Sequence, residues 1–161
     1  MVLTSSEDTQ TSKNLLTKDY ISKAIETLSN YSYDELYVLV DFVEESEECS
    51  FGSDPIDPID PELIGDIEIG SNLELEEQYY ALIHEVGHAV LYASGSEPDD
   101  IVLLETLAWT EGLRIVNRLG LKVNQPRFRD QMIHALNLYH TEIKKESIWV
   151  FTDKESDNDN K

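Results

Sequence analysis

LEEQYYALIHEVGHAVLYAS, residues 75–94, carries both a structural and a chemical pattern. Its apolar residues follow a helical period, which predicts a helix from about residue 73 to residue 94. Gly95 comes next, and glycine commonly ends a helix because it adopts the left-handed conformation without strain. The segment therefore predicts one long amphipathic helix that ends at residue 94.

This helix contains an HExxH motif, His84-Glu85-Val86-Gly87-His88. Histidines four residues apart project from the same helix face, so both imidazoles can reach one tetrahedral Zn²⁺. Glu85 lies one position round the helix, where its carboxylate can take a proton from the water that the metal activates and pass it to a leaving amine. We expect zinc as the cofactor, His84 and His88 as ligands and Glu85 as the catalytic base. The alternative is a pair of histidines that only pack or cap.

A third ligand is expected from outside the motif, because a catalytic zinc usually has three protein ligands. The metzincin arrangement is excluded, since its glycine and third histidine would fall at Leu91 and Ser94. A second helix is predicted to begin after Ser96, with Pro98 in its first turn, and to run to Gly120. The third ligand is then a carboxylate from this helix.

Glu105 is the best candidate for that carboxylate. Ala108 and Gly112 share its helix face, and such small side chains allow a close approach to the HExxH helix. Gly87 and Ala89 thin the opposing surface in the same way. We expect Glu105 to face the two histidines.

Three other carboxylates remain open as the third ligand. Glu111 lies on the same helix as Glu105 but about 240° round it, on a face shared with leucines. Asp99 and Asp100 stand near the start of the helix. The small-residue argument ranks Glu105 ahead of all three.

The flanking segments predict a helix-rich α+β domain with a small β-sheet, in which the HExxH helix packs on the Glu-bearing helix. A helix is expected at residues 17–29 and a buried strand at residues 37–43, which are β-branched and aromatic. Ser32 with Glu35 resembles a capping box, which favours a helix there instead. Both interpretations stay open from the sequence.

Further along, three prolines make residues 49–62 an expected exposed loop. GDIEIG at residues 65–70 predicts a short strand. A last helix should follow the turn at Asn124 and Pro126 and reach about Tyr139 or beyond. Its inward residues are expected to be Phe128, Met132, Ala135 and Leu136.

The chain holds 12 Lys and Arg against 33 Asp and Glu, a net charge of −21. This balance argues against direct binding to nucleic acid or to an anionic membrane, because both depend on Lys and Arg. No Lys or Arg occurs from residue 24 through residue 113, where 23 Asp and Glu lie. A solvated acidic surface explains the pattern, and a cationic substrate, a basic protein partner or mimicry of nucleic acid are alternatives.

The chain organisation suggests one domain at residues 13–151 between disordered polar tails at residues 1–12 and 152–161. Cys49 is the only cysteine, which excludes an intrachain disulfide and favours the reducing cytoplasm. No apolar run approaches the roughly 18 residues that span a bilayer, and the N-terminus lacks a signal-peptide pattern. We expect a cytoplasmic protein.

Three segments, GDIEI, LIHEVGHAVLY and ETLAW, resemble small HExxH zinc peptidases of the gluzincin kind. Within that group the chain looks most like the compact ImmA/IrrE-type and phage-encoded metallopeptidases, over about residues 63–119. The resemblance implies that His84, His88 and Glu105 bind zinc and that Glu85 is the general base and acid. It also implies an edge strand that holds an extended substrate, here residues 66–69.

The expected function is that of a zinc-dependent metallopeptidase acting on a peptide or protein substrate, in the host cytoplasm or the virion if the chain is phage-encoded. The alternatives are a non-hydrolytic zinc-binding module, regulatory or virion-associated, and an acidic nucleic-acid mimic. A peptidase also needs a group that stabilises the oxyanion. Candidates on the last helix are His134, Tyr139 and His140.

Overall fold

The computed structural model describes residues 16–53 and 62–152, with side chains described through residue 140. This part of the chain has the expected α+β architecture, four helices and a small mixed sheet. The expected tail at residues 1–12 lies outside the described residues, and so does the expected tail at residues 152–161 apart from Thr152, which ends the last helix. The elements in chain order are α1 (Lys18–Leu36), β1 (Val38–Val43), β2 (Cys49–Gly52), β3 (Gly65–Gly70), α2 (Leu75–Ser94), α3 (Ile101–Arg118) and α4 (Gln125–Thr152).

The sheet has the strand order β1-β3-β2, with β1 parallel and β2 antiparallel to the central strand β3. One face is apolar and buried against the helices, including Val38, Ile67 and Ile69. The other face carries exposed Asp41 and Glu68, which lie opposite one another in the β1–β3 register. Alternation of apolar and acidic residues therefore decides which face packs on the helices.

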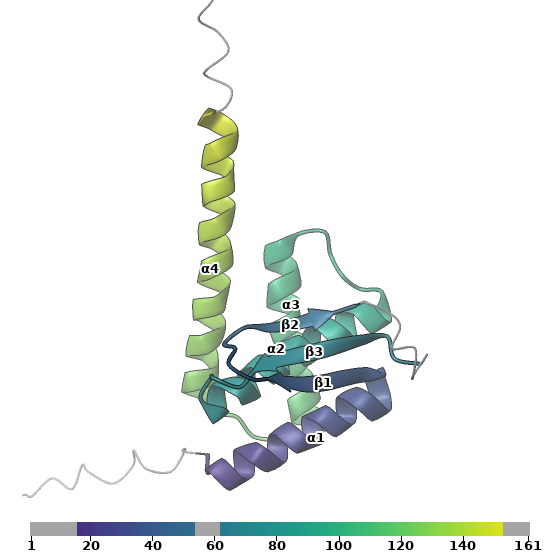
Figure 1. Cartoon of the computed structure of the whole chain (residues 1–161). Coiled ribbons are helices and arrows are strands. Elements are labelled where there is room, and N and C mark those ends of the chain that lie inside the picture. The colour runs from purple at the N-terminus through teal and green to yellow at the C-terminus, as the bar shows by residue number, and fades with distance from the viewer. Residues whose placement is uncertain (1–15, 54–61, 153–161) are drawn as a thin grey trace, which may run out of the picture.

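Helix α2 lies at the centre of the fold, in contact with α1, α3, β2 and β3. Its middle is buried almost all round, because residues 79–87 and 89 are shielded by the sheet on one side and by helices on the others. Figure 1 shows the sheet lying across α2, with α1 running beside β1 and α4 extending away from the body. The HExxH motif is thus held by the most enclosed element.

Two predictions for the sheet were wrong. Residues 49–52 of the expected loop form strand β2, in which Phe51 pairs opposite Ile67, while residues 54–61 lie outside the described residues. Residues 66–69 belong to β3, which is the central strand and not the expected substrate-holding edge. Strand β2 is an edge strand, because it pairs with β3 on one side only. It is also the edge strand that contacts α2, the helix that carries the motif.

Helix α1 extends seven residues beyond its predicted end, from residue 29 to Leu36. The Ser32 hydroxyl donates to the Leu28 carbonyl at 2.9 Å, so Ser32 lies inside the helix and does not cap one. Tyr37 ends α1 at a φ of 56°, and β1 begins directly after it. The strand predicted at residues 37–43 is therefore confirmed as β1, and the alternative of a helix capped by Ser32 in its place was wrong.

The other helix ends are set by capping. Gly95 ends α2 with a φ of 64°, as predicted. Helix α3 begins at Ile101, where the Asp100 side chain accepts a hydrogen bond from the Leu103 N–H at 2.8 Å. Pro98 therefore precedes α3 instead of lying in its first turn.

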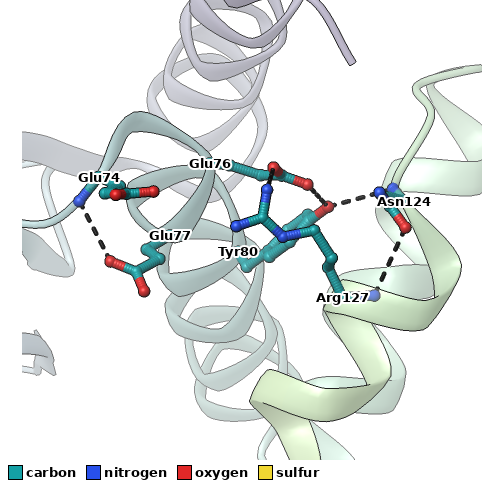
Figure 2. Close-up of polar contacts among 6 residues, drawn as sticks. All are labelled: Glu74, Glu76, Glu77, Tyr80, Asn124 and Arg127. Atoms are coloured by element: carbon teal, nitrogen blue, oxygen red, sulfur yellow. Dashed lines mark hydrogen bonds and ion pairs between the residues drawn. The ribbon is translucent and has the colours of Figure 1, made fainter. Parts of the chain in front are cut away.

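Helix α4 is attached to α2 by polar contacts at its first turn, shown in Figure 2. The Tyr80 hydroxyl donates to Glu76 at 2.5 Å and accepts from the Asn124 N–H at 3.1 Å. Arg127 forms an ion pair with the same Glu76. Phe128 is buried beneath this network, as predicted, with Met132, Ala135 and Leu136 partly buried. None of the described helices combines the length and the hydrophobicity needed to cross a membrane.

Candidate metal centre

Helices α2 and α3 touch through glycines that leave no room for a side chain. A Cβ added to Gly87 would lie 1.8 Å from the Ala108 carbonyl oxygen, and one added to Gly112 would lie 1.9 Å from the Ile83 carbonyl oxygen. Contact between carbonyl and glycine Cα brings the two helix backbones together. This confirms the small-residue argument that selected the face of α3 carrying Glu105.

Three donor groups converge where these helices meet. The Nε2 atoms of His84 and His88 are 3.2 Å apart. The Glu105 carboxylate lies 3.0 Å from the His84 Nε2 and 3.4 Å from the His88 Nε2. Among the residues that the structure describes, this is the group of His, Cys, Asp or Glu that lies close enough together to hold a metal ion.

The spacing of these donors fits a tetrahedral ion. With metal–nitrogen distances of about 2.0–2.1 Å, two ligand atoms of a tetrahedral site lie about 3.3–3.4 Å apart. The two Nε2 atoms, 3.2 Å apart, are close to this value, and each of them has a different Glu105 oxygen nearby, at 3.0 Å from His84 and 3.4 Å from His88. His84, His88 and Glu105 therefore lie close enough together to hold a metal ion.

The electrostatic surroundings shift the pKa values of Glu105 and His88 in opposite directions. Burial alone would raise the pKa of Glu105, but hydrogen bonds from His84 and His88 outweigh it and lower the pKa to about 2. Burial would lower the pKa of His88, yet the hydrogen bond and charge of Glu105 raise it above its ordinary value. Glu105 is thus ionised at neutral pH, and protons compete with a metal at His88.

Glu85 also lies beside these donors. Its carboxyl group is buried, and it is not one of the three that converge. It is 6% exposed, and its carboxylate accepts a hydrogen bond from the Phe51 backbone N–H of strand β2. Burial raises the pKa of Glu85, and the charges of His84 and His88 counteract only part of that rise. A carboxyl group with a raised pKa exchanges protons closer to neutral pH.

Aromatic rings back the site on the α3 and α4 side. Trp109 is 3% exposed and stacks on the His84 imidazole with ring centroids 4.4 Å apart. Phe128 packs edge-on against Trp109. These aromatic rings cover one face of the His84 imidazole with apolar surface.

The donors lie at the base of an open depression of about 310 Å³. One part of its wall is strand β2 with the residue after it, and another part comes from the α2–α3 loop, α3 and α4. Its lining consists of Cys49, Ser50, Phe51, Ser53, His84, Glu85, His88, Glu97, Leu104, Glu105 and Tyr139. A ligand can therefore reach the donor atoms from solvent.

The other candidate ligands lie away from the three donors. Glu111 forms an ion pair with Arg114 at 2.6 Å on α3. Asp99 is exposed, and Asp100 caps α3. The structure therefore brings Glu105, and none of these three, to the histidines.

Of the three candidates for oxyanion stabilisation, one lies near the donors and two lie elsewhere. Tyr139 lines the depression. His134 lines a different depression, near Glu76 and Arg127, and His140 is exposed. Tyr139 is the one of the three that the structure places beside the donors.

Sequence reasoning missed the wall of the depression. The four residues 49–51 and 53 belong to a segment that was expected to be a loop, and Glu97 belongs to a short connection without a motif. A weak signal for the strand was the run CSFG, which is free of Lys, Glu and Pro. Nothing in the local sequence pointed to Glu97.

The comparisons with known proteins give no match: the chain fits no protein-family model, no curated protein and no solved structure. The cluster of His84, His88 and Glu105 therefore rests on its own geometry, as a site that can hold a metal ion.

Proposed function

We propose that this chain is a zinc-dependent metallopeptidase that hydrolyses peptide bonds in a peptide or protein substrate. The observation that carries the proposal is the placement of Glu85, which is buried beside three convergent donors at the base of an open depression. Two histidines and one carboxylate are the ligand set of many hydrolytic zinc sites. The open depression favours an enzyme over a zinc-bearing module that does no chemistry.

The protein groups have separate roles in this proposal. A bound zinc ion supplies Lewis acidity, which polarises a carbonyl group and lowers the pKa of a water molecule to about 7. Glu85 accepts a proton from the attacking water at its carboxylate and donates it to the leaving amine. The Phe51 N–H holds that carboxylate in position. Tyr139 is the candidate donor to the oxyanion that develops on the substrate.

Strand β2 offers a place for the substrate backbone. It is an edge strand, and three of its residues line the depression. An extended peptide that adds to this edge gains main-chain hydrogen bonds whatever its sequence. Its carbonyl groups would then run past Glu85.

The proposal is tested by comparing zinc-loaded wild type with Glu85→Gln on a diverse peptide pool, read by mass spectrometry. The substitution keeps the size of the side chain and removes the basic carboxylate, so turnover should fall by about 10²–10⁴-fold while zinc content stays the same. Glu68→Gln, the same change on the outer sheet face, is the control and should keep full activity. Equal cleavage by wild type and Glu85→Gln would overturn the proposal, and so would an absence of cleavage by fully loaded wild type.

A further inference from the structure

One carboxylate in the depression has no part in metal binding or proton transfer. Glu97 comes from the connection between α2 and α3 and lines the depression together with the donors. It is exposed, and its charge acts on His88. No described Lys or Arg forms an ion pair with it. Glu97 is therefore available to a ligand.

The charge of the lining has one sign. Apart from the histidines, its charged residues are Glu85, Glu97 and Glu105, and it contains no Lys or Arg. Glu105 is committed to the two histidines by its contacts, and Glu85 is buried. Glu97 is thus the exposed negative charge in a cleft where a positive ligand group meets no like charge from a protein side chain.

Besides Phe51 of strand β2, two side chains with large apolar surfaces line the depression with Glu97. Leu104 comes from α3 and Tyr139 from α4. Lys and Arg side chains bury their apolar stems along such surfaces and keep the charged head at the polar end. A tyrosine ring also attracts a cation that lies over its face. A neutral apolar side chain would satisfy Leu104 and Tyr139 but leave Glu97 unpaired.

We propose that Glu97, Leu104 and Tyr139 form a subsite for a Lys or Arg side chain of the substrate, next to the bond that is cut. The inference rests on the proposed peptidase function and adds the substrate class, a peptide with a basic residue beside the scissile bond. Leu104 and Tyr139 contact the stem, and Glu97 pairs with the ammonium or guanidinium group.

The test uses one peptide sequence in which Lys is compared with acetyl-lysine, which keeps the stem and loses the charge. The ratio of kcat/KM for the two peptides is measured with zinc-loaded wild type, Glu97→Gln and Glu68→Gln. An exposed ion pair contributes up to about 1 kcal/mol, so wild type should prefer the Lys peptide about 3- to 5-fold at low salt. Glu97→Gln should bring the ratio close to 1.

Glu68→Gln is the matched control, because it removes the same charge from the outer face of the sheet. It should keep the wild-type ratio if the preference belongs to the subsite. A ratio near 1 in wild type, or a preference that persists in Glu97→Gln, would overturn the inference. An equal loss in both variants would also overturn it, since the preference would then come from the overall charge of −21.

A binding measurement separates this inference from the proposed function. The same peptides are titrated by calorimetry into zinc-loaded Glu85→Gln, with and without Glu97→Gln. Cleavage without a charge preference would leave the peptidase in place and overturn the subsite. A 3- to 5-fold binding preference that depends on Glu97, together with no cleavage by wild type, would support the subsite and overturn the peptidase. Neither cleavage nor preferential binding would overturn both.

Discussion

The indole of Trp109 lies against the imidazole of His84, with ring centroids 4.4 Å apart and an interplanar angle of 26°. The Nδ1 atom of His84 is buried and has no hydrogen-bond partner among the described residues. Metal-binding histidines normally donate this second ring N–H to a carboxylate, a carbonyl or water, which fixes the ring plane. At His84 we expect the stacked indole to take over this role and hold the plane of the ring.

Replacing Trp109 should therefore weaken zinc binding. Trp109→Leu removes the flat surface behind His84, and we expect zinc affinity to fall by about 10–100-fold, as for other residues that orient a ligand. Trp109→Phe should recover most of the affinity. Competition against a chromophoric chelator measures both values.

Phe128→Leu is the control for this change, because Phe128 packs on Trp109 and Tyr80. It should lower the free energy of unfolding and leave zinc affinity within a few-fold of wild type. Wild-type zinc affinity in Trp109→Leu would show that stacking does not orient His84.

Because α2 packs closely on α3, adding a single methyl group at Gly87 should destabilise the protein. Gly87→Ala would place a Cβ 1.8 Å from the Ala108 carbonyl oxygen, which as backbone cannot rotate away. We expect the zinc-free protein to lose about 3 kcal/mol or more of unfolding free energy in urea titrations.

Gly120→Ala gives the comparison for that loss. Gly120 has a φ of 69° and no atom within 4 Å of the added Cβ, so its cost should be about 1–2 kcal/mol from backbone strain alone. An equal cost for both variants would contradict the close approach of the two helices.

The choice of the third ligand separates two glutamates on α3. Glu105→Gln removes a carboxylate oxygen 3.0 Å from the His84 Nε2 and should lower zinc affinity by at least about 100-fold. Glu111→Gln removes only an ion pair with the exposed Arg114 and should leave zinc affinity unchanged. The reverse order, measured by equilibrium dialysis, would place the third ligand elsewhere.

Zinc should stabilise the protein more at pH 8 than at pH 6. Ligation requires neutral imidazole, and the pKa of His88 is raised above its ordinary value of 6.5, so protons displace zinc as the pH falls through that range. Without zinc, the protonated His88 beside Glu105 stabilises the fold below pH 6.5, and this contribution is lost as the pH rises through the raised pKa. Both effects increase the difference in stability between the zinc-bound and the zinc-free protein at high pH.

Thermal melts with zinc and with chelator, recorded from pH 6 to pH 8, measure this difference as a zinc-induced shift in Tm. In the chelated protein, the lowered pKa of Glu105 makes stability depend on pH in a second, acidic range. The stabilisation by the Glu105 carboxylate is present above pH 4.5 and disappears as the pH falls toward about 2. A zinc-induced shift in Tm that stays constant or shrinks from pH 6 to pH 8 would contradict the ligand role of His88.

The helical part of the site was predictable because helix geometry is local. A four-residue spacing alone places His84 and His88 on one face, and the period of α3 places Glu105 with Ala108 and Gly112. The same period places Glu111 on a different face of α3 from Glu105. Local sequence therefore identified the two histidines and ranked Glu105 ahead of the other carboxylates.

The sheet was less predictable because strand pairing joins segments far apart in the chain. Residues 49–52 become a strand only through pairing with β3, and that same pairing moves β3 from the edge to the centre. Helix α1 passes its expected end with Ser32 inside it, and the Ser32 hydroxyl bonds to the Leu28 carbonyl instead of capping a new helix. Glu97 reaches the depression through the α2–α3 connection, whose path carries no sequence signal.

Zinc stoichiometry is the most direct test of the metal centre on which the proposed function depends. Zinc bound per chain is measured by plasma mass spectrometry after dialysis, for wild type and for the double variant His84→Ala, His88→Ala. We predict one equivalent in wild type and none in the double variant, because two of the three convergent donors are removed. A full equivalent of zinc in the double variant would contradict the assignment.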